Sequence, residues 1–192
     1  MNQKNKMSVR TMALGAVLTA LVVVLQLLGT FVRFGPFQIS LVLVPIVIGA
    51  AAGGAGLGGW LGAIFGLVVL LNGDAAAFLA VNAVGTVITV MAKGTLCGYL
   101  AGKVYRALAD KNKAAAVVAA ALTCPVVNTG IFLVGCFLFF MNTLAQWGQS
   151  MGFDNVFEYM IFGMVGVNFL VELGANALLS PVILRLLKQN NL

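Results

Sequence analysis

Four polar side chains recur at helical spacing in the apolar stretch between Phe78 and Lys103. They are Asn82, Thr86, Thr89 and Lys93. Steps of four, three and four residues bring them within roughly 40° of one another on one face of an α-helix. A lysine placed in hydrocarbon costs at least ~2.5 kcal/mol, so we expect Lys93 to face a protein partner or a watery cavity rather than lipid.

Two later apolar stretches carry polar side chains that could meet this face. Asn128 lies close to Pro125, which leaves a backbone carbonyl without its helical donor, and Asn168 and Glu172 lie one helical turn apart. Amides both donate and accept hydrogen bonds, as binding of a small polar molecule requires, although each asparagine alone could equally bond one helix to another. Lys93 and Glu172 fall at similar predicted depths, so a structural ion pair and direct ligand contact both stay open.

The composition predicts an integral membrane protein. Of 192 residues, 61% are hydrophobic and only 8% are charged, with a mean hydropathy of +1.07, whereas about a quarter of the residues of a soluble domain are charged. The net charge of +6 does not indicate nucleic-acid binding, because the basic residues form short clusters between apolar runs. Histidine is absent and the three cysteines have no C-x-x-C spacing, so we predict no metal site, no cofactor and no catalytic residue.

The expected fold class is an all-α integral membrane protein, a compact bundle of six transmembrane helices in a single domain, 1–192. The expected spans are 11–31, 37–53, 57–71, 76–103, 114–141 and 159–187. The positive-inside rule assigns the basic clusters around Arg10, Arg106 and Arg185 to the cytoplasm, so both termini are expected there. An even number of crossings must then separate the first two clusters, which requires 37–71 to cross twice and to turn near 53–56.

Small residues recur in two of these spans and predict close helix contacts. The first span carries Ala13, Ala16 and Ala20. This alanine ridge could receive a partner protein or a neighbouring span of the same chain. The third span carries Gly58, Gly62 and Gly66. We assign this glycine repeat to packing within the chain rather than to dimerisation.

The asparagines and the aromatic residues near the outer ends of the spans predict a pocket that opens to the outer side. The outer segment 142–158 mixes acidic and aromatic residues and suits either a lid over that pocket or an interfacial anchor. The glycine-rich stretches lack the nucleotide-binding pattern G-x-x-x-x-G-K-[ST]. If ATP drives transport, another chain must therefore supply the ATPase.

Several motifs occur in a characteristic order: the alanine ridge after a basic start, FQISLVLVPIVIGAAAGG before the glycine repeat, and LNGD before the fourth span. In this order and total length, the chain resembles the substrate-binding S component of an energy-coupling factor (ECF) transporter over nearly its whole length, most closely the riboflavin, folate and pantothenate branch. The resemblance implies a vitamin-binding subunit of the prokaryotic cytoplasmic membrane that docks on a transmembrane coupling protein, the T component, carrying two ABC-type ATPases.

The resemblance also assigns roles within this chain. It implies docking through Ala13, Ala16 and Ala20, although Ala13 and Gly15 obscure which face is presented. It further implies that the outer loops 30–40, 71–77 and 142–158 close the binding site. Together with the polar spacing, we predict these substrate-binding residues: Arg33, Asn82, Lys93, Asn128, Asn168 and Glu172.

The substrate and the class of function leave alternatives open. Lys93 or Arg33 could pair with the carboxylate of a vitamin, which we favour, whereas a neutral ring would use the asparagines and aromatic residues. A membrane enzyme acting on a lipid or isoprenoid, with Glu172 or Asp74 as base and Lys93 as electrophile, is the alternative from another class. A stand-alone carrier is disfavoured because the chain shows no inverted repeat.

Overall fold

The computed structural model describes residues 9–31, 33–34, 37–38 and 41–189. Its helices are α1 (Val9–Phe31), α2 (Leu43–Leu71), α3 (Ala76–Val81), α4 (Ala83–Ala109), α5 (Lys113–Phe139), α6 (Met141–Ser150), α7 (Val156–Glu158), the π-helix η1 (Tyr159–Val165) and α8 (Gly166–Gln189). Two short strands, β1 (Arg33–Phe34) and β2 (Phe37–Gln38), pair antiparallel between α1 and α2. The predicted all-α fold class is confirmed, with this small ribbon as an addition.

Five helical segments of the described chain are long and apolar enough to cross a membrane. They are Thr11–Gly29, Leu43–Leu71, Ala83–Ala109, Lys113–Phe139 and Val156–Gln189. Large apolar side chains remain exposed around the bundle, including Val17 (66%), Leu138 (64%) and Leu178 (80%). Such a surface is suited to lipid rather than water. The chain is therefore a multi-pass membrane protein.

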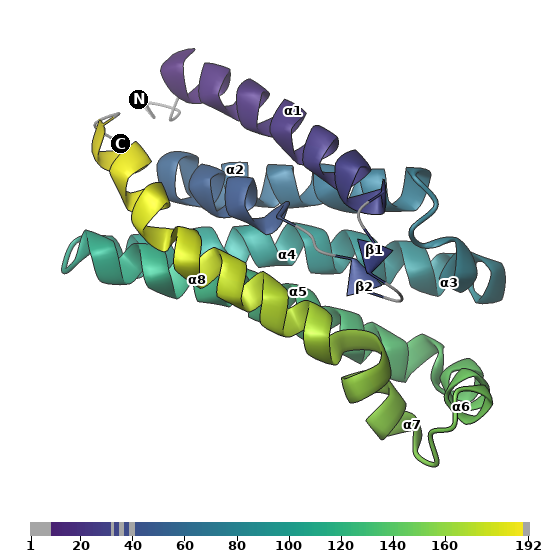
Figure 1. Ribbon diagram of the computed structural model, residues 1–192. Coiled ribbons are helices and arrows are strands. Elements are labelled where there is room, and N and C mark those ends of the chain that lie inside the picture. The colour runs from purple at the N-terminus through teal and green to yellow at the C-terminus, as the bar shows by residue number, and fades with distance from the viewer. Residues whose placement is uncertain (1–8, 32, 35–36, 39–40, 190–192) are drawn as a thin grey trace, which may run out of the picture.

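The long helix α2 is broken at Gly54. Its φ of 79° and ψ of −175° belong to a region that is essentially restricted to glycine. Ala50 and Gly58, on either side of the break, lie against each other, whereas an unbroken helix would hold them ~12 Å apart along its axis. The two halves of α2 therefore fold back on each other (Figure 1). The reversal falls within the expected 53–56 turn, and separate membrane crossings by the two halves stay a prediction.

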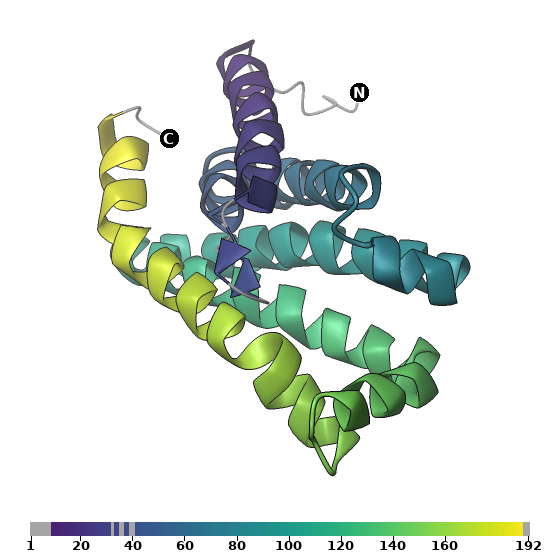
Figure 2. The same ribbon diagram turned by 45° about the vertical axis from the view of Figure 1, so that its right-hand side comes forward.

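The helices stack in the order α1, α2, α4 and α5, with α8 crossing α5 (Figure 2). The second half of α2 meets α4 through glycines, since Gly62 lies against Gly94 and Gly58 against Gly98. These contacts bring the two backbones together, as the glycine repeat predicts for packing within the chain. The described structure is a single chain and does not test dimerisation.

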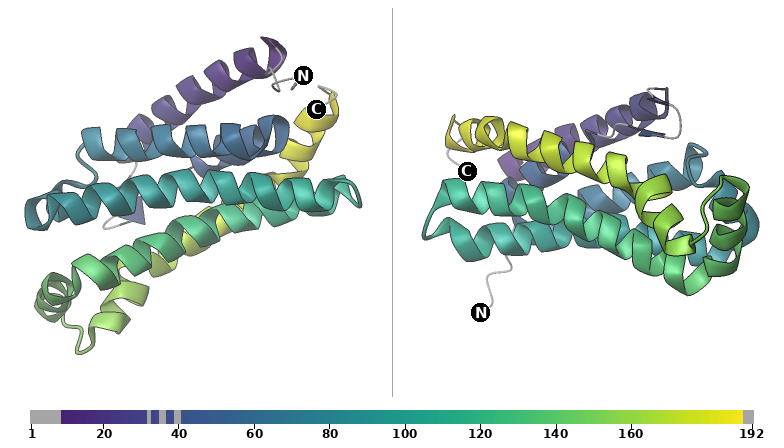
Figure 3. Two further views of the ribbon diagram at one scale, coloured as in Figure 1. Left: turned by 180° about the vertical axis from the view of Figure 1, so that it is seen from behind. Right: turned by 60° about the horizontal axis from the view of Figure 1, so that its bottom comes forward.

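The connections gather at the two ends of the bundle. The start of α1, the Gly54 turn, the α4–α5 connection and the end of α8 lie at one end, and the α2–α3 and α5–α6 connections lie at the other (Figures 1 and 3). The positions of Arg10, Arg106 and Arg185, one from each basic cluster, therefore belong to the same end, which is the arrangement that the positive-inside rule requires. We call this the basic end and the opposite one the far end.

The single helix expected from Phe78 to Lys103 is wrong at its start. Asn82 adopts an extended conformation, with φ −150° and ψ 93°, and separates α3 from α4. Its side-chain oxygen accepts a hydrogen bond from the Gly85 N–H at 2.9 Å. Asparagine favours this N-cap geometry because its short side chain satisfies an amide that the helix itself leaves without a partner.

Candidate functional site

A cavity of about 870 Å³ lies among the helices toward the far end. This volume is within the ~300–1,000 Å³ range of small-molecule sites. Residues of α1, α2, α3, α4, α5, η1 and α8 and of three connections line it. They are Gln26, Phe65, Val69, Asp74, Ala75, Phe78, Thr86, Thr89, Val90, Lys93, Asn128, Thr129, Phe132, Cys136, Phe140, Met151, Phe153, Tyr159, Phe162, Gly163, Met164, Val165, Asn168, Phe169 and Glu172.

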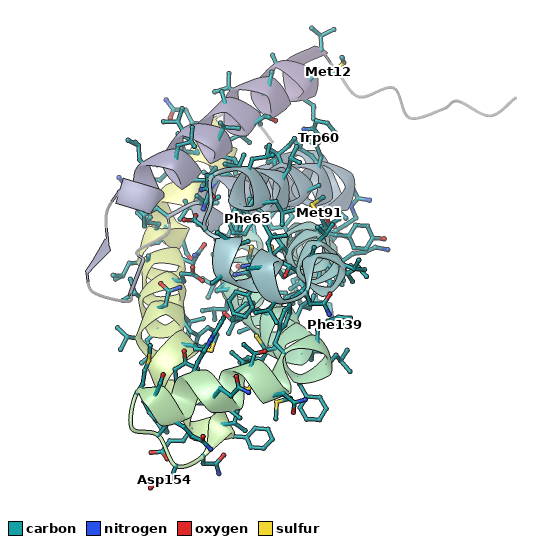
Figure 4. The ribbon with its side chains drawn as sticks, turned by 90° about the vertical axis from the view of Figure 1, so that its right-hand side faces the viewer. Met12, Trp60, Phe65, Met91, Phe139 and Asp154 are labelled. Carbon is teal, nitrogen blue, oxygen red and sulfur yellow. The ribbon has the colours of Figure 1, made fainter. Side chains whose placement is uncertain are left out.

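Lys93 lies between two aromatic rings of the cavity wall. Its Nζ is 5.5 Å from the centroid of Phe65 and 5.3 Å from that of Phe132. Figure 4, which views the bundle end-on, shows Phe65 in the interior. Contacts of this kind stabilise a cation by ~0.5–2 kcal/mol. They partly compensate the cost of removing the ammonium group from water without supplying a negative charge.

Glu172 lies across the cavity from α4, on α8, and is only 5% exposed. It is close enough to Lys93 for electrostatic interaction. No ion pair joins the two side chains, and no other described side chain forms an ion pair with either of them. The structural pair that the sequence left open is therefore not formed, and both charged groups face the cavity.

Three neutral polar groups of the wall also lack partners within the described residues. The buried oxygens of Thr89, Asn128 and Asn168 form no hydrogen bond there. Thr89 is 5% exposed and Asn128 is 6% exposed. An unsatisfied buried polar group costs ~1–3 kcal/mol, so each oxygen is expected to gain a donor when the cavity is filled.

Aromatic side chains form the wall toward the far end. Phe78 packs edge-to-face against Phe132, Phe140 and Trp147, with ring centroids 5.8, 5.0 and 5.6 Å apart. Phe153 and Tyr159 form a further pair at 5.5 Å. A wall of this kind suits a planar, apolar ligand group. Phe78, Phe153 and Tyr159 line the cavity, whereas Trp147 does not line it and contacts it only through its packing against Phe78.

The π-helix η1 contributes a contiguous run to the wall. Tyr159 and the four residues 162–165 line the cavity. A π-helix is wider than an α-helix and recurs at functional sites. Neither its position nor the lining role of Phe65, Phe132 and Phe169 was predicted, because apolar residues on the inner face of a membrane helix look alike in sequence whether they line a cavity or a packed core.

Polar groups hold the first helix to the α2–α3 connection at the edge of the cavity. The Asp74 carboxylate accepts hydrogen bonds from Gln26 Nε2 at 2.7 Å and from Asn72 Nδ2 at 2.8 Å. Gln26 is only 3% exposed. The LNGD motif therefore fixes a corner of the cavity and ties it to α1.

The predicted site residues separate into three groups. Lys93, Asn128, Asn168 and Glu172 all line the cavity. Asn82 does not line it and caps α4 instead. The backbone of Arg33 pairs with Gln38 in the β-ribbon, and its side chain lies outside what the structure describes. Binding of a substrate by any of these residues stays a prediction.

The alanine ridge faces away from the bundle. All three of its residues, Ala13, Ala16 and Ala20, are exposed. The opposite face of α1 is buried against α2 through Gly15, Leu18 and Val22. Packing of the ridge against another span of the same chain, the second interpretation of its spacing, is therefore wrong for the described residues. Docking of a partner on this face stays a prediction.

The fold and cavity define a helical membrane protein with an internal cavity of the size typical of small-molecule sites. Residues 10–184 match the family described as ECF transporter, substrate-specific component. The chain belongs to this family, whose members are substrate-specific transporter subunits. In prokaryotes, such a protein lies in the cell membrane. The enzyme alternative is not favoured by this membership. Searches of curated proteins and of solved structures found no match for the chain.

Proposed function

We propose that the chain is the substrate-specificity subunit of an ECF-type ABC importer. It binds a water-soluble vitamin or related micronutrient from the outer side and delivers it inward when docked on a T component with two ABC-type ATPases. The observation that carries this proposal is the cavity of about 870 Å³, in which Lys93, Glu172 and unpaired amide oxygens lie beside an aromatic wall. Such a site suits a polar molecule with a ring.

Docking is supported by the exposed alanine ridge of α1. Small side chains allow a second helix to approach closely, and in a membrane this close packing is a main source of helix association. A helix that packs only within its own chain gains no close contact from small side chains on its exposed face. The ridge and the cavity lie on separate surfaces, so a bound partner would not compete with the substrate.

Co-purification tests the proposed function most directly. The protein is purified from cells, and one portion is heated to release its retained small molecules, which are identified by mass spectrometry. A second portion is emptied by dialysis without heating and is titrated with each B vitamin. We expect one compound near equimolar amount that rebinds. A protein that retains nothing and is indifferent to every vitamin would contradict the proposal.

A matched pair of variants locates the binding site. Thr129→Trp places a bulky side chain in the cavity wall, whereas Thr123→Trp changes the same helix outside it. We expect the first to lower retention of the compound at least ~10-fold, since a filled cavity excludes its ligand, and the second to leave it unchanged. Concentrative uptake by the chain alone in liposomes would instead support a stand-alone carrier.

A further inference from the structure

Lys93 and Glu172 share one cavity without neutralising each other at contact distance. Both line its wall, and they attract each other electrostatically, but no ion pair joins them in the described part of the chain. A charged group taken out of water is costly unless a partner is close. Asp74 also lines the cavity, but its carboxylate accepts hydrogen bonds from Gln26 and Asn72 and forms no ion pair with Lys93. Lys93 and Glu172 therefore each lack a counter-group at contact distance among the described side chains of the wall.

The two charged groups lie on different helices that line the cavity. The Lys93 ammonium, on α4, lies between the rings of Phe65 on α2 and Phe132 on α5. Glu172, on α8, forms no ion pair with it, so its carboxylate lies beyond contact distance of the ammonium group. Counter-groups on one ligand molecule are therefore expected at separate places on its skeleton rather than on one carbon atom.

The cavity wall carries two hydrogen-bond acceptors besides the Glu172 carboxylate. Asn168 precedes Glu172 by one helical turn on α8, and Asn128 lines the cavity from α5. Both amide oxygens lack a donor within the described residues. Three acceptors that line one cavity favour a ligand group that carries several N–H bonds, and a carboxylate among them favours a positive charge.

We propose that the substrate is a ring-bearing zwitterion. A cationic, N–H-rich group engages Glu172, Asn128 and Asn168, and a separate anionic group engages Lys93. A ligand with an anion alone would leave the Glu172 carboxylate uncompensated and would be repelled by it, so the site selects against simple acids. The aromatic wall beside these groups receives the ring.

Because this substrate class rests on the proposed function, the first test is the charge of the retained compound itself. The compound released from the purified protein is examined by capillary electrophoresis from pH 2 to pH 12, on the order of the range in which carboxyl and amino groups titrate. We expect one acidic and one basic group. A compound with only an acid, only a base or no charge would overturn the zwitterion and leave the proposed function intact, whereas the absence of any retained compound contradicts the proposed function instead.

The second test assigns each charge to its residue. Affinities of the emptied protein are measured for the released compound, its N-acetyl form and its methyl ester, in wild type, Glu172→Gln and Lys93→Met. We expect wild type to bind both derivatives at least ~10-fold more weakly than the parent, since each loses a charge-assisted hydrogen bond. Glu172→Gln should lose only the discrimination against the N-acetyl form, and Lys93→Met only that against the ester.

Two exposed residues of the α4–α5 connection supply the control variants, Asp110→Asn and Lys111→Met. Both should retain the full discrimination of wild type. If each cavity variant lost both the discrimination against the N-acetyl form and that against the ester, or lost neither, the assignment would be overturned. Size-exclusion elution and thermal unfolding establish whether the variants are folded. If they are not, the charge of the compound released from wild type decides whether the substrate is a zwitterion.

Discussion

Gly62 of α2 and Gly94 of α4 meet backbone to backbone, and a Cβ atom placed on either would collide with the carbonyl oxygen of the other. Gly58 and Gly98 repeat this contact one turn away. The second half of α2 is thereby held against α4, the helix that contributes Thr86, Thr89 and Lys93 to the cavity wall. The glycine contacts position one wall of the site.

We expect Gly62→Ala to destabilise the protein. The collision lies with backbone rather than with a flexible side chain, and overpacking of this kind costs ~1–3 kcal/mol. The measurement is the thermal unfolding midpoint in detergent. Gly130→Ala is the matched control, because an added Cβ at this helical position meets open space. Equal midpoints for the two variants would show that the α2–α4 contact is looser than described.

We expect Gly54→Ala to destabilise the protein as well, by ~1–3 kcal/mol, because alanine does not tolerate this backbone conformation. The sign of the effect is informative. In an unbroken helix the same substitution would stabilise by up to ~1 kcal/mol, since alanine has the higher helix propensity. Gly56→Ala, two residues away and helical, serves as the control. A higher unfolding midpoint for Gly54→Ala would contradict the reversal of α2.

Cysteine labelling tests the six crossings. In a background with Cys97, Cys124 and Cys136 replaced by alanine, Gly56→Cys lies at the basic end of the bundle and Ser150→Cys lies in α6 at the far end. The positive-inside rule predicts that a membrane-impermeant maleimide labels only Ser150→Cys in intact cells and both in opened cells. Labelling of Gly56→Cys in intact cells would contradict a cytoplasmic turn at Gly54.

The helical periodicity of the sequence was sufficient to identify four polar residues that line one cavity. Lys93, Asn128, Asn168 and Glu172 are polar exceptions in apolar runs, and hydrocarbon excludes them from the outer surface. The membership of Asn82 in the same face was wrong for a local reason. N-capping depends on backbone angles that residue spacing does not encode. The Asn82 side chain accepts a hydrogen bond from a backbone N–H at the start of the helix, and this bond requires a non-helical conformation at Asn82.

The aromatic wall and the π-helix could not be predicted in the same way. Phe65, Phe132 and Phe162 resemble the many apolar residues that pack between helices or face lipid. Which of them lines a cavity depends on how neighbouring helices diverge, and this is decided by contacts between distant segments, such as those of Gly62 with Gly94. The sequence therefore predicted the polar half of the site and not its apolar half.

Asn82 and Asn168 should respond differently to truncation. Asn82→Ala removes an N-cap and is expected to lower the free energy of unfolding by ~0.5–2 kcal/mol, while the affinity for the compound retained by the protein is unchanged. Asn82→Ser should restore stability because serine also caps. Asn168→Ala should weaken binding at least ~5-fold, on the order of one hydrogen bond. A loss of affinity in Asn82→Ala that Asn82→Ser does not restore would return Asn82 to the binding site.

Docking through the alanine ridge is tested by enlarging its central residue. In Ala16→Leu an isobutyl group projects from the exposed face of α1 and holds an approaching helix away, which removes the close contact on which small-residue association depends. We expect at least ~10-fold less T component to co-purify, equivalent to ~1.4 kcal/mol. Substrate affinity should be unchanged, because the ridge contributes nothing to the cavity wall.

Ala177→Leu is the control for this substitution, since Ala177 is an exposed alanine on α8, away from the ridge. It adds the same apolar surface to the membrane-facing side of the bundle and should leave co-purification intact. If Ala177→Leu and Ala16→Leu lower co-purification equally, the effect comes from the added bulk in the membrane rather than from the ridge. If neither does, the coupling protein docks on another face, and the outward position of the three alanines needs a different explanation.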